Sequence, residues 1–150
     1  MPVIPHPYPP APDGAVALIR RDDQRVLLIR RAQGVDAPGC FCFPGGRVRS
    51  GERAADAACR EAYEETGLRI RVIRHIWTCR LSQGTRLDWF LCRLSDPGQT
   101  VALDPNEADD AQWLLLEDIA ELDRLLPSVP AFIAAVTAGD ISLTTEGERL

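Results

Sequence analysis

Lysine is absent from this chain, in which all 17 basic residues are arginines. The count alone does not separate arginine-rich phosphate recognition from a bias in residue usage, and we interpret it as bias. Acidic residues outnumber basic ones, and the formal net charge of −5 argues against a sequence-independent grip on nucleic-acid phosphates. No apolar run is long enough for a membrane span. The first residues lack the basic and apolar regions of a signal peptide, so we expect no targeting segment there.

A regular spacing of cysteines is absent as well, which bears on the cellular compartment. The five cysteines are Cys40, Cys42, Cys59, Cys79 and Cys92. An odd number at irregular spacing argues against a disulfide framework and favours a reducing, cytoplasmic location. A zinc site would need partner ligands at short spacing, and His6 and His75 offer none. We therefore expect the thiols to be buried as small hydrophobic groups.

Length and composition predict one domain preceded by a proline-rich arm. A chain of 150 residues, 45% hydrophobic and 26% charged, has the proportions of a single soluble globular domain. Residues 1–13 contain six prolines, which favours an extended arm that packs loosely on the surface. Whether the arm takes part in a homodimer contact is left open. Residues 14–150 form the expected single domain.

The rest of the sequence alternates between strand and helix patterns. Apolar runs bounded by turn residues predict strands, and a longer pattern that stops at Gly67 predicts a helix with Ser50 as its N-cap. The segment 44–46 is expected to break the chain sharply. The expected strands are 14–20, 24–31, 40–43, 69–80, 86–94 and 112–116, and the expected helices are about 52–67, 117–122 and 129–138. This order indicates an α/β (α+β) fold with a mixed β-sheet sandwiched between helices, an α/β/α sandwich.

Three glutamates crowd the end of the expected central helix. Glu61, Glu64 and Glu65 fall within an arc of about 100°, where like charges three or four residues apart repel each other by roughly a few tenths of a kcal/mol. Either this is a solvated face, or a positive group binds there. The upstream residues are small and would leave room for such a group. They are Ala54, Ala57 and Ala58.

The other faces of this helix follow from the same spacing. Arg60 is expected on the outer side, where it can pair with Asp56 and Glu64 at i,i+4. The face expected to bury consists of Ala55, Ala58, Cys59, Ala62 and Thr66.

The segment 46–68 carries a complete motif. Read as GRVRSGERAADAACREAYEETGL, it fits G-x5-E-x7-R-E-U-x-E-E-x-G-U at every position, where U is aliphatic. The seven fixed positions would match by chance at roughly 10⁻⁸ per start point. They are Gly46, Glu52, Arg60, Glu61, Glu64, Glu65 and Gly67. The chain resembles the Nudix hydrolase family (MutT-like pyrophosphohydrolases), and the likeness extends over residues 14 to about 123.

The resemblance implies the family's fold and a metal-dependent hydrolysis of a diphosphate linkage. Oxygen ligands on one helical face suit Mg²⁺, with Mn²⁺ as the alternative. The implied metal ligands are the carbonyl of Gly45 and the side chains of Glu61, Glu64, Glu65 and Glu107. Glu52 and Arg60 would form a contact that orients the loop against the helix. The general base is either Glu61 or Glu107, the latter with Asp109 and Asp110 as competitors.

The substrate is expected to be a small nucleotide or nucleotide derivative rather than nucleic acid or membrane. Arg31 is favoured over Arg30 as a phosphate contact, because neighbouring strand residues point to opposite faces, and Gly46 is assigned to the same site. Gly84 stands where ADP-ribose hydrolases of this family often have a proline, and Thr85 stands where dinucleoside polyphosphate hydrolases often have a tyrosine. The single-domain length and the segment 30–46 look most like those of the small nucleoside triphosphate pyrophosphohydrolases. The alternatives are an ADP-ribose or nucleotide-sugar pyrophosphatase and a non-catalytic nucleotide-sensing module.

Three aromatic residues could stack on a nucleobase, and the sequence favours none of them over the others. They are Phe41, Trp77 and Trp89. Aromatic side chains on strands belong more often to a core than to a ligand platform.

Overall fold

The computed structural model describes residues 1–7 and 13–144 and contains eleven elements within them. Their order is β1 (Val3–Ile4), β2 (Gly14–Ile19), β3 (Val26–Arg31), β4 (Phe41–Cys42), β5 (Gly45–Arg47), α1 (Ala54–Thr66), β6 (Ile70–Leu81), β7 (Arg86–Leu94), β8 (Ala108–Leu114), the 3-10 helix η1 (Leu116–Glu121) and α2 (Ser128–Thr137). Among these described residues, no helix is both long and apolar enough to cross a membrane.

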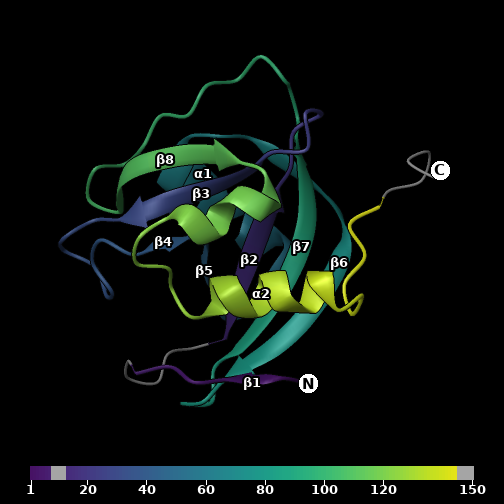
Figure 1. Cartoon of the computed structure of the whole chain (residues 1–150). Helices are drawn as coiled ribbons and strands as arrows, with labels where there is room; N and C mark the ends of the chain where they lie inside the picture. The colour runs from purple at the N-terminus through teal and green to yellow at the C-terminus, as the bar shows by residue number, and fades with distance from the viewer. Residues whose placement is uncertain (8–12, 145–150) are drawn as a thin grey trace.

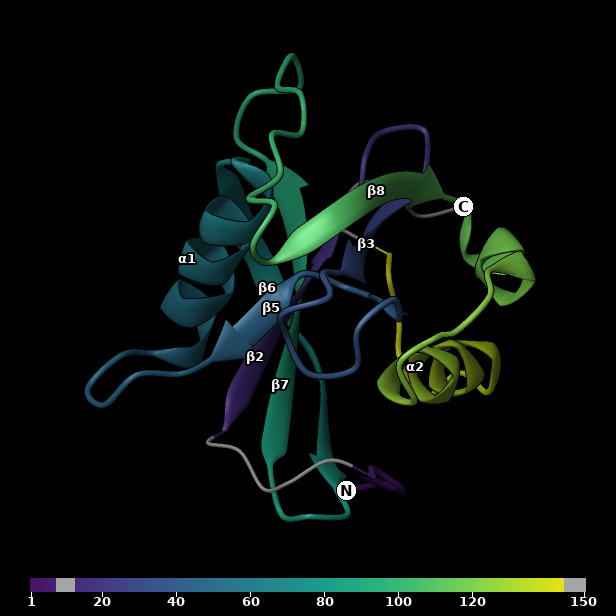
Figure 2. The same ribbon diagram turned by 90° about the vertical axis from the view of Figure 1, so that its left-hand side faces the viewer.

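The strands form two sheets between the two α-helices (Figure 1). The larger sheet has the order β1-β6-β7-β2-β5 and is mixed, because β1 with β6 and β2 with β7 are parallel pairs while the other pairs are antiparallel. The smaller sheet, β4-β3-β8, is antiparallel. Figure 2 shows α1 and α2 on opposite sides of the strands. The predicted fold class is confirmed, with the sheet divided in two.

Each helix covers its own part of the core. Beneath α2 lies an aromatic cluster, in which Trp89 stacks on Phe132 with ring centroids 4.7 Å apart. Beneath α1 the contact is made by alanines, of which Ala57, Ala58 and Ala62 are fully buried. Of the face predicted to be buried, Ala58, Ala62 and Thr66 are fully buried, whereas Ala55 and Cys59 are only partly buried against the same cluster. Small side chains here bring α1 close to β2 and β5.

The start of α1 also differs from the prediction. Ser50 is not the N-cap, because the helix begins at Ala54 and its cap, Arg53, makes no side-chain capping bond. The preceding residues form a turn in which the amide of Glu52 donates to the carbonyl of Arg49 at 3.0 Å. The predicted stop is confirmed: Gly67 has φ 72°, a left-handed conformation suited to glycine, and donates to the Tyr63 carbonyl.

The arm and the predicted chain break both contain unpredicted strands. Val3 and Ile4 extend the larger sheet in parallel with the end of β6, so this part of the arm is anchored rather than loosely packed. Arm residues 8–12 lie outside the described residues. The segment 45–47, expected as a break, pairs with β2. A Cβ atom at Gly45 would overlap the Ala15 carbonyl and lie 2.9 Å from Cα of Val16, so only glycine allows this approach.

The hairpin of β6 and β7 is present as predicted, with two irregularities. The register shifts between Val72 and Arg74 and again between His75 and Trp77, which marks two bulges. The last strand, β8, starts at Ala108 rather than residue 112. Its first residues are acidic and lie opposite the arginine end of β3, where Asp110 pairs with Arg30 in register.

The predicted burial of the cysteines is confirmed for three of the five, while Cys40 and Cys59 are partly exposed. All five are free thiols, and Cys42, Cys79 and Cys92 are buried. Burial raises the pKa of Cys42 to about 11, so this thiol is protonated at neutral pH.

Candidate active site

The last turns of α1 lie against β5, and glycine makes their close approach possible. A Cβ atom at Gly46 would lie 2.6 Å from Oε2 of Glu61, which is too close for any other residue to occupy the position without moving the carboxylate. The spacing of the motif thus places the end of its loop directly beneath the first glutamate of its helix. The structure brings these two predicted site residues together.

Glu65 is the most buried carboxyl group of the site, with 7% of its surface exposed. Its Oε1 accepts a hydrogen bond from the Gly45 amide at 2.9 Å. The pKa of Glu65 is raised to about 8, chiefly by burial and also by the charges of Glu61 and Glu107, while the Gly45 amide and Arg31 act in the opposite direction. The nearby positive charge is therefore too small to offset the burial of this carboxyl group.

Arg60 is the principal cation on this part of α1. Its guanidinium contacts Glu52 at 2.8 and 3.0 Å and donates to the Arg47 carbonyl at 2.8 Å. These bonds join the helix to the preceding loop, as the predicted orienting contact requires. Hydrogen bonding to Arg60 lowers the pKa of Glu52 to about 2, with a further contribution from the Arg49 amide. The catalytic role of the pair stays a prediction.

The same guanidinium also reaches the glutamate face. Nη1 of Arg60 contacts Glu61 at 3.0 Å and Glu64 at 3.2 Å. Arg60 is therefore not an outer, solvated residue; only 18% of its side chain is exposed. The predicted pair with Glu64 is present, whereas Asp56 pairs with Arg53 at 3.0 Å instead of with Arg60. Arg60 turns away from Asp56 because the loop offers it Glu52 and a carbonyl oxygen.

Glu61 and Glu107, the two candidates for the general base, lie in different surroundings. Glu61 is half-buried, and desolvation raises its pKa in spite of the Arg60 contact. Glu107 is exposed on the turn before β8, and its charge acts on both Glu61 and Glu65. Its backbone is fixed, since its carbonyl accepts from the Ala32 amide at 3.0 Å. Both carboxylates therefore border the same site.

The competitors of Glu107 are engaged elsewhere. Asp109 forms an ion pair with Arg30 at 2.6 Å. Asp110 accepts hydrogen bonds from the amide of Ala111 and the side chain of Gln112. Glu107 is the acidic residue of this loop whose charge raises the pKa of both Glu61 and Glu65.

The donor set fits a hard divalent cation. Within residues 1–7 and 13–144, no three His, Cys, Asp or Glu side chains already converge as in a formed metal site. Glu65, however, is buried beside two other carboxylates with a single amide donor, and a cation would reverse the electrostatic cost of its ionisation. All candidate ligands offer oxygen, which Mg²⁺ and Mn²⁺ prefer.

A cavity of about 220 Å³ opens beside the glycines of β5. Arg31, Gly45 and Gly46 are among the residues that line it. The Arg31 guanidinium donates to the Asp36 carbonyl and lies 3.9 Å from Sγ of Cys42. Arg30 instead contacts Asp109, so of the two neighbouring arginines it is Arg31 that faces the cavity, as predicted.

The lining of the cavity also includes residues that the sequence analysis missed. They are His6 from the arm, Gln83 and Thr85 from the β6–β7 turn, and Ser128 from α2. The apolar pair Val3-Ile4 between prolines was the available signal that the arm adds a strand. The aromatic wall is Phe43 and Trp89, whose rings lie edge to face 5.6 Å apart. Trp77 packs on Trp89 behind this wall, and Phe41 is in the core.

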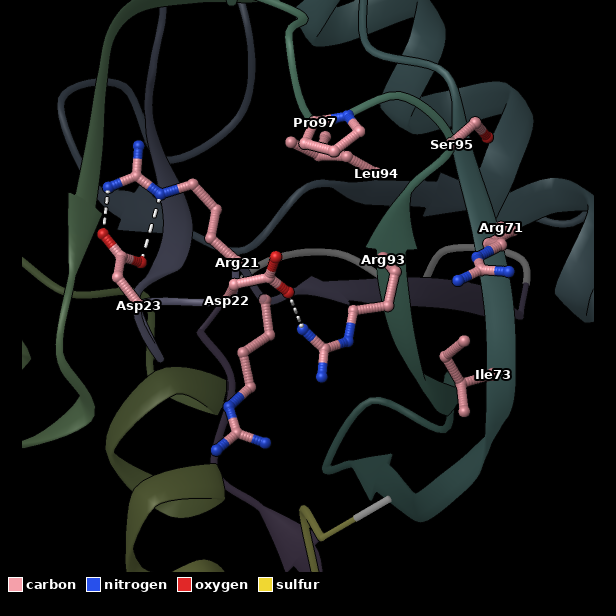
Figure 3. Close-up of a pocket in the computed structure, with 10 residues that line it drawn as sticks. Arg21, Asp22, Asp23, Arg71, Ile73, Arg93, Leu94, Ser95 and Pro97 are labelled. Atoms are coloured by element: carbon pink, nitrogen blue, oxygen red, sulfur yellow. Dashed lines mark hydrogen bonds and ion pairs between the residues drawn. The ribbon is translucent and has the colours of Figure 1, made fainter. Parts of the chain in front are cut away.

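A larger hollow, of about 720 Å³, lies past the other end of β2 (Figure 3). Four arginines line it together with Asp22 and Asp23, and the ion pairs of Arg21 with Asp23 and of Arg93 with Asp22 cross its rim. No glutamate of α1 lines either hollow, but Gly45 and Gly46, which lie against Glu65 and Glu61, line the smaller one. We therefore place the candidate active site at the smaller cavity.

Comparisons with known proteins identify the family of this chain. The family model described as the NUDIX domain matches residues 10–136. A CMP-5'-(N-acetyl-N-hydroxy-3-aminopropyl)phosphonate hydrolase of Streptomyces rubellomurinus is 33% identical over 121 residues, covering 79% of this chain and 59% of the relative. An isopentenyl-diphosphate Delta-isomerase of Cutibacterium acnes is 35% identical over 122 residues, covering 70% of this chain and 60% of the relative. This chain thus spans less than two thirds of the length of either relative.

A solved structure shows the same fold. The MutT protein from Methanosarcina mazei Go1 superposes with a TM-score of 0.69 at 22% identity, over 93% of this chain and 96% of that protein. At this identity the likeness concerns the fold alone.

Proposed function

Because the chain belongs to the NUDIX domain family, we propose that it is a divalent-metal-dependent pyrophosphohydrolase that cleaves a diphosphate linkage in a nucleotide derivative. The observation that carries the proposal is Glu65. This carboxyl group is buried beside Glu61 and within the field of Glu107, next to a cavity of a size for a small ligand. A folded chain gains nothing from such crowding unless a cation and an anionic substrate join it.

The groups of the site would have three roles, which are metal binding, support of the metal ligands and proton transfer. Glu61, Glu64, Glu65, Glu107 and the Gly45 carbonyl would hold the metal. When bound, the metal polarises a phosphoryl oxygen and lowers the pKa of a coordinated water.

Two arginines support these ligands without holding the metal. Arg60, held by Glu52 and the Arg47 carbonyl, keeps α1 aligned with the loop and restrains Glu61 and Glu64. Arg31 lines the cavity together with Gly45 and Gly46 and would contribute a positive charge to a bound phosphate.

Proton transfer from the attacking water falls to Glu61 or Glu107. Glu61 has a raised pKa and is half-buried, which suits a base that operates near neutral pH. Glu107 lies on a fixed turn that is open to solvent, from which a proton could leave. The two alternatives differ in one respect: a Glu107→Gln variant would retain metal binding through α1, whereas Glu61→Gln would disturb the Arg60 network as well.

The substrate we propose is a nucleoside di- or triphosphate derivative. The cavity has the size for one small organic group, and Gly45 and Gly46 in its lining lie against Glu65 and Glu61. The Streptomyces relative is named for a CMP-linked phosphonate, which supports a nucleotide substrate. ADP-ribose and nucleotide sugars are the alternatives with the same chemistry. A non-catalytic sensor is disfavoured because every glutamate of the motif is in place.

The test is hydrolysis of a substrate panel by the whole chain with Mg²⁺ or Mn²⁺. The panel contains nucleoside triphosphates, nucleotide sugars, ADP-ribose and isopentenyl diphosphate, the last because the Cutibacterium relative is named an isomerase. Glu64→Gln should lose activity by a factor of at least about 100. Glu117→Gln, an exposed glutamate on η1, is the matched control and should retain full activity.

Two results would overturn the proposal. An absence of hydrolysis of every diphosphate compound by the wild-type chain would reject the hydrolase function. Full activity in Glu64→Gln would reject the metal assignment.

A further inference from the structure

The larger hollow past the end of β2 lies apart from the candidate active site, and its lining is rich in arginine. Its volume of about 720 Å³ falls within the range of roughly 300–1,000 Å³ that is usual for small-ligand pockets. Four of the 17 arginines line it, in a chain whose net charge is −5. They are Arg20 and Arg21 after β2, Arg71 of β6 and Arg93 of β7. The fold therefore gathers positive charge at one place on an acidic protein.

Two of these arginines face each other across neighbouring strands. Arg71 of β6 lies directly opposite Arg93 of β7 in the antiparallel register. Side chains at such positions stand on the same face with their Cβ atoms ~4.5–5.5 Å apart, and like charges there destabilise the pair. Both side chains line the hollow (Figure 3). An anion bound between the two guanidinium groups would replace this repulsion by attraction.

The two carboxylates at the rim leave Arg71 without a counter-charge. Asp23 is engaged by two neighbouring arginines, at 2.7 and 3.2 Å. Asp22 contacts Arg93 at 3.0 Å, but its side chain is 94% exposed, so solvent screens this ion pair and makes it weak. Within residues 1–7 and 13–144, Arg71 is exposed and has neither a hydrogen bond nor an ion pair. Its guanidinium is thus available to a ligand.

We propose that this hollow is a second ligand site, which binds the phosphate group of a phosphate monoester between Arg71 and Arg93. Such a phosphate carries a charge of about −1.5 to −2 and three acceptor oxygens, enough for the planar forks of two guanidinium groups at once. A carboxylate has one charge and two oxygens, which a single arginine fork satisfies. The pair of arginines therefore favours phosphate over carboxylate.

The apolar part of the lining indicates that an organic group carries the phosphate. Ile73, Leu94 and Pro97 line the same hollow. Ile73 lies at the first register shift of β6 and is 38% exposed, which is high for a large apolar side chain on a strand. A free phosphate ion has no apolar surface to bury against these side chains, whereas a monoester with an apolar or ring-shaped group does.

The experiment is an NMR titration of the whole isotope-labelled chain in the presence of a chelator. The probes are phenyl phosphate, inorganic phosphate and benzoate, which has the same ring with a carboxylate. We expect phenyl phosphate to bind at least about tenfold more tightly than benzoate. Inorganic phosphate should shift the same signals with a lower affinity. The amide signals that should shift are those of Arg71, Ile73, Arg93 and Ser95, which line the hollow.

Variants with opposite expected effects test the role of the arginines. Arg71→Gln should weaken the binding of phenyl phosphate at least about tenfold, because a charge-assisted hydrogen bond is lost. Asp22→Asn, which removes the carboxylate that competes for Arg93, should tighten it. Arg80→Gln, a change in the same strand at a residue that lines neither hollow, is the matched control and should leave the affinity unchanged. Without ligand, Arg71→Gln should melt no lower than the wild type, since it removes the repulsion across the strands.

Four results would overturn the inference. They are an absence of shifts with every probe, unchanged affinity in Arg71→Gln, equal binding of benzoate and phenyl phosphate, and shifts confined to β5 and α1, which would place the ligand at the active site. Equal binding of inorganic phosphate and phenyl phosphate would reject the organic part of the ligand. No probe contains a diphosphate linkage and no metal is present, so this result and the hydrolysis of the substrate panel can fail independently of each other.

Discussion

Glu65→Gln should stabilise the metal-free protein at pH 8 and leave its stability nearly unchanged at pH 4. The reason is the position of Glu65, which is buried beside Glu61 and Glu107 with one amide donor. In the unfolded chain its pKa has the ordinary value of 4.5, and in the folded protein it is about 8. The folded state therefore holds this proton more tightly than the unfolded state does.

The sign and size of the effect follow from this difference. Below pH 4.5 the group is protonated in both states, and its contribution to stability is fully present. As the pH rises toward 8 the unfolded state gains stability by ionising, and the folded protein becomes less stable. The interval from 4.5 to about 8 corresponds to about 5 kcal/mol at about 1.4 kcal/mol per unit. Glutamine does not ionise, so the variant should escape this loss.

The assay is thermal unfolding of wild type and Glu65→Gln between pH 4 and 9 in the presence of a chelator. A chain of this size changes its Tm by roughly 2–4 °C per kcal/mol. The difference between the variants should therefore grow to about 10 °C at the alkaline end. Saturating Mg²⁺ or Mn²⁺ at pH 8 should raise the Tm of the wild type and have a smaller effect on the variant.

Two results would refute the reasoning. If both proteins show the same dependence of Tm on pH in chelator, Glu65 does not carry a displaced ionisation. If the metal raises both melting temperatures equally, Glu65 is not among the ligands.

Three further variants test the supporting contacts. Glu52→Gln, which weakens the bonds that hold Arg60, should lower activity by about 10–100-fold with little change in fold by circular dichroism; unchanged activity would remove the orienting role. Gly46→Ala should displace the Glu61 carboxylate and lower both activity and stability, the latter by about 1–3 kcal/mol in denaturant unfolding; wild-type activity would show that Glu61 can move freely. Gly67→Ala should cost about 1 kcal/mol of stability, because its φ is 72°, and should leave kcat unchanged; equal stability would mean that the helix end had relaxed.

Much of the site could be predicted because the motif encodes it locally. Glu61, Glu64 and Glu65 share a helical face by spacing alone, and the contact between Glu52 and Arg60 joins residues only eight positions apart. The helix stop at Gly67 was equally local. Residues that act within one helix and its loop leave a readable pattern.

The rest depends on pairing between distant segments. The strand at Val3 became visible only through its contact with β6, which lies about half the chain away. Gln83 lies in an ordinary turn, and only the folded chain shows that it lines the cavity. Ala57 is fully buried and Ala55 only partly buried, because of the direction from which the sheet approaches α1. Spacing along one segment contains no information about that direction.

The two bulges in β6 have a consequence for the behaviour of the protein in concentrated solution. Among the described residues, only Arg80 and Leu81 of this strand pair with β1, and no other strand lies along its outer edge. A long open edge is a template for aggregation through strands of a second molecule. The register shifts twist this edge, and Arg71 and Arg74 place positive charges on it. The irregular geometry of β6 should therefore keep the chain dispersed where a straight strand would promote fibril-like association.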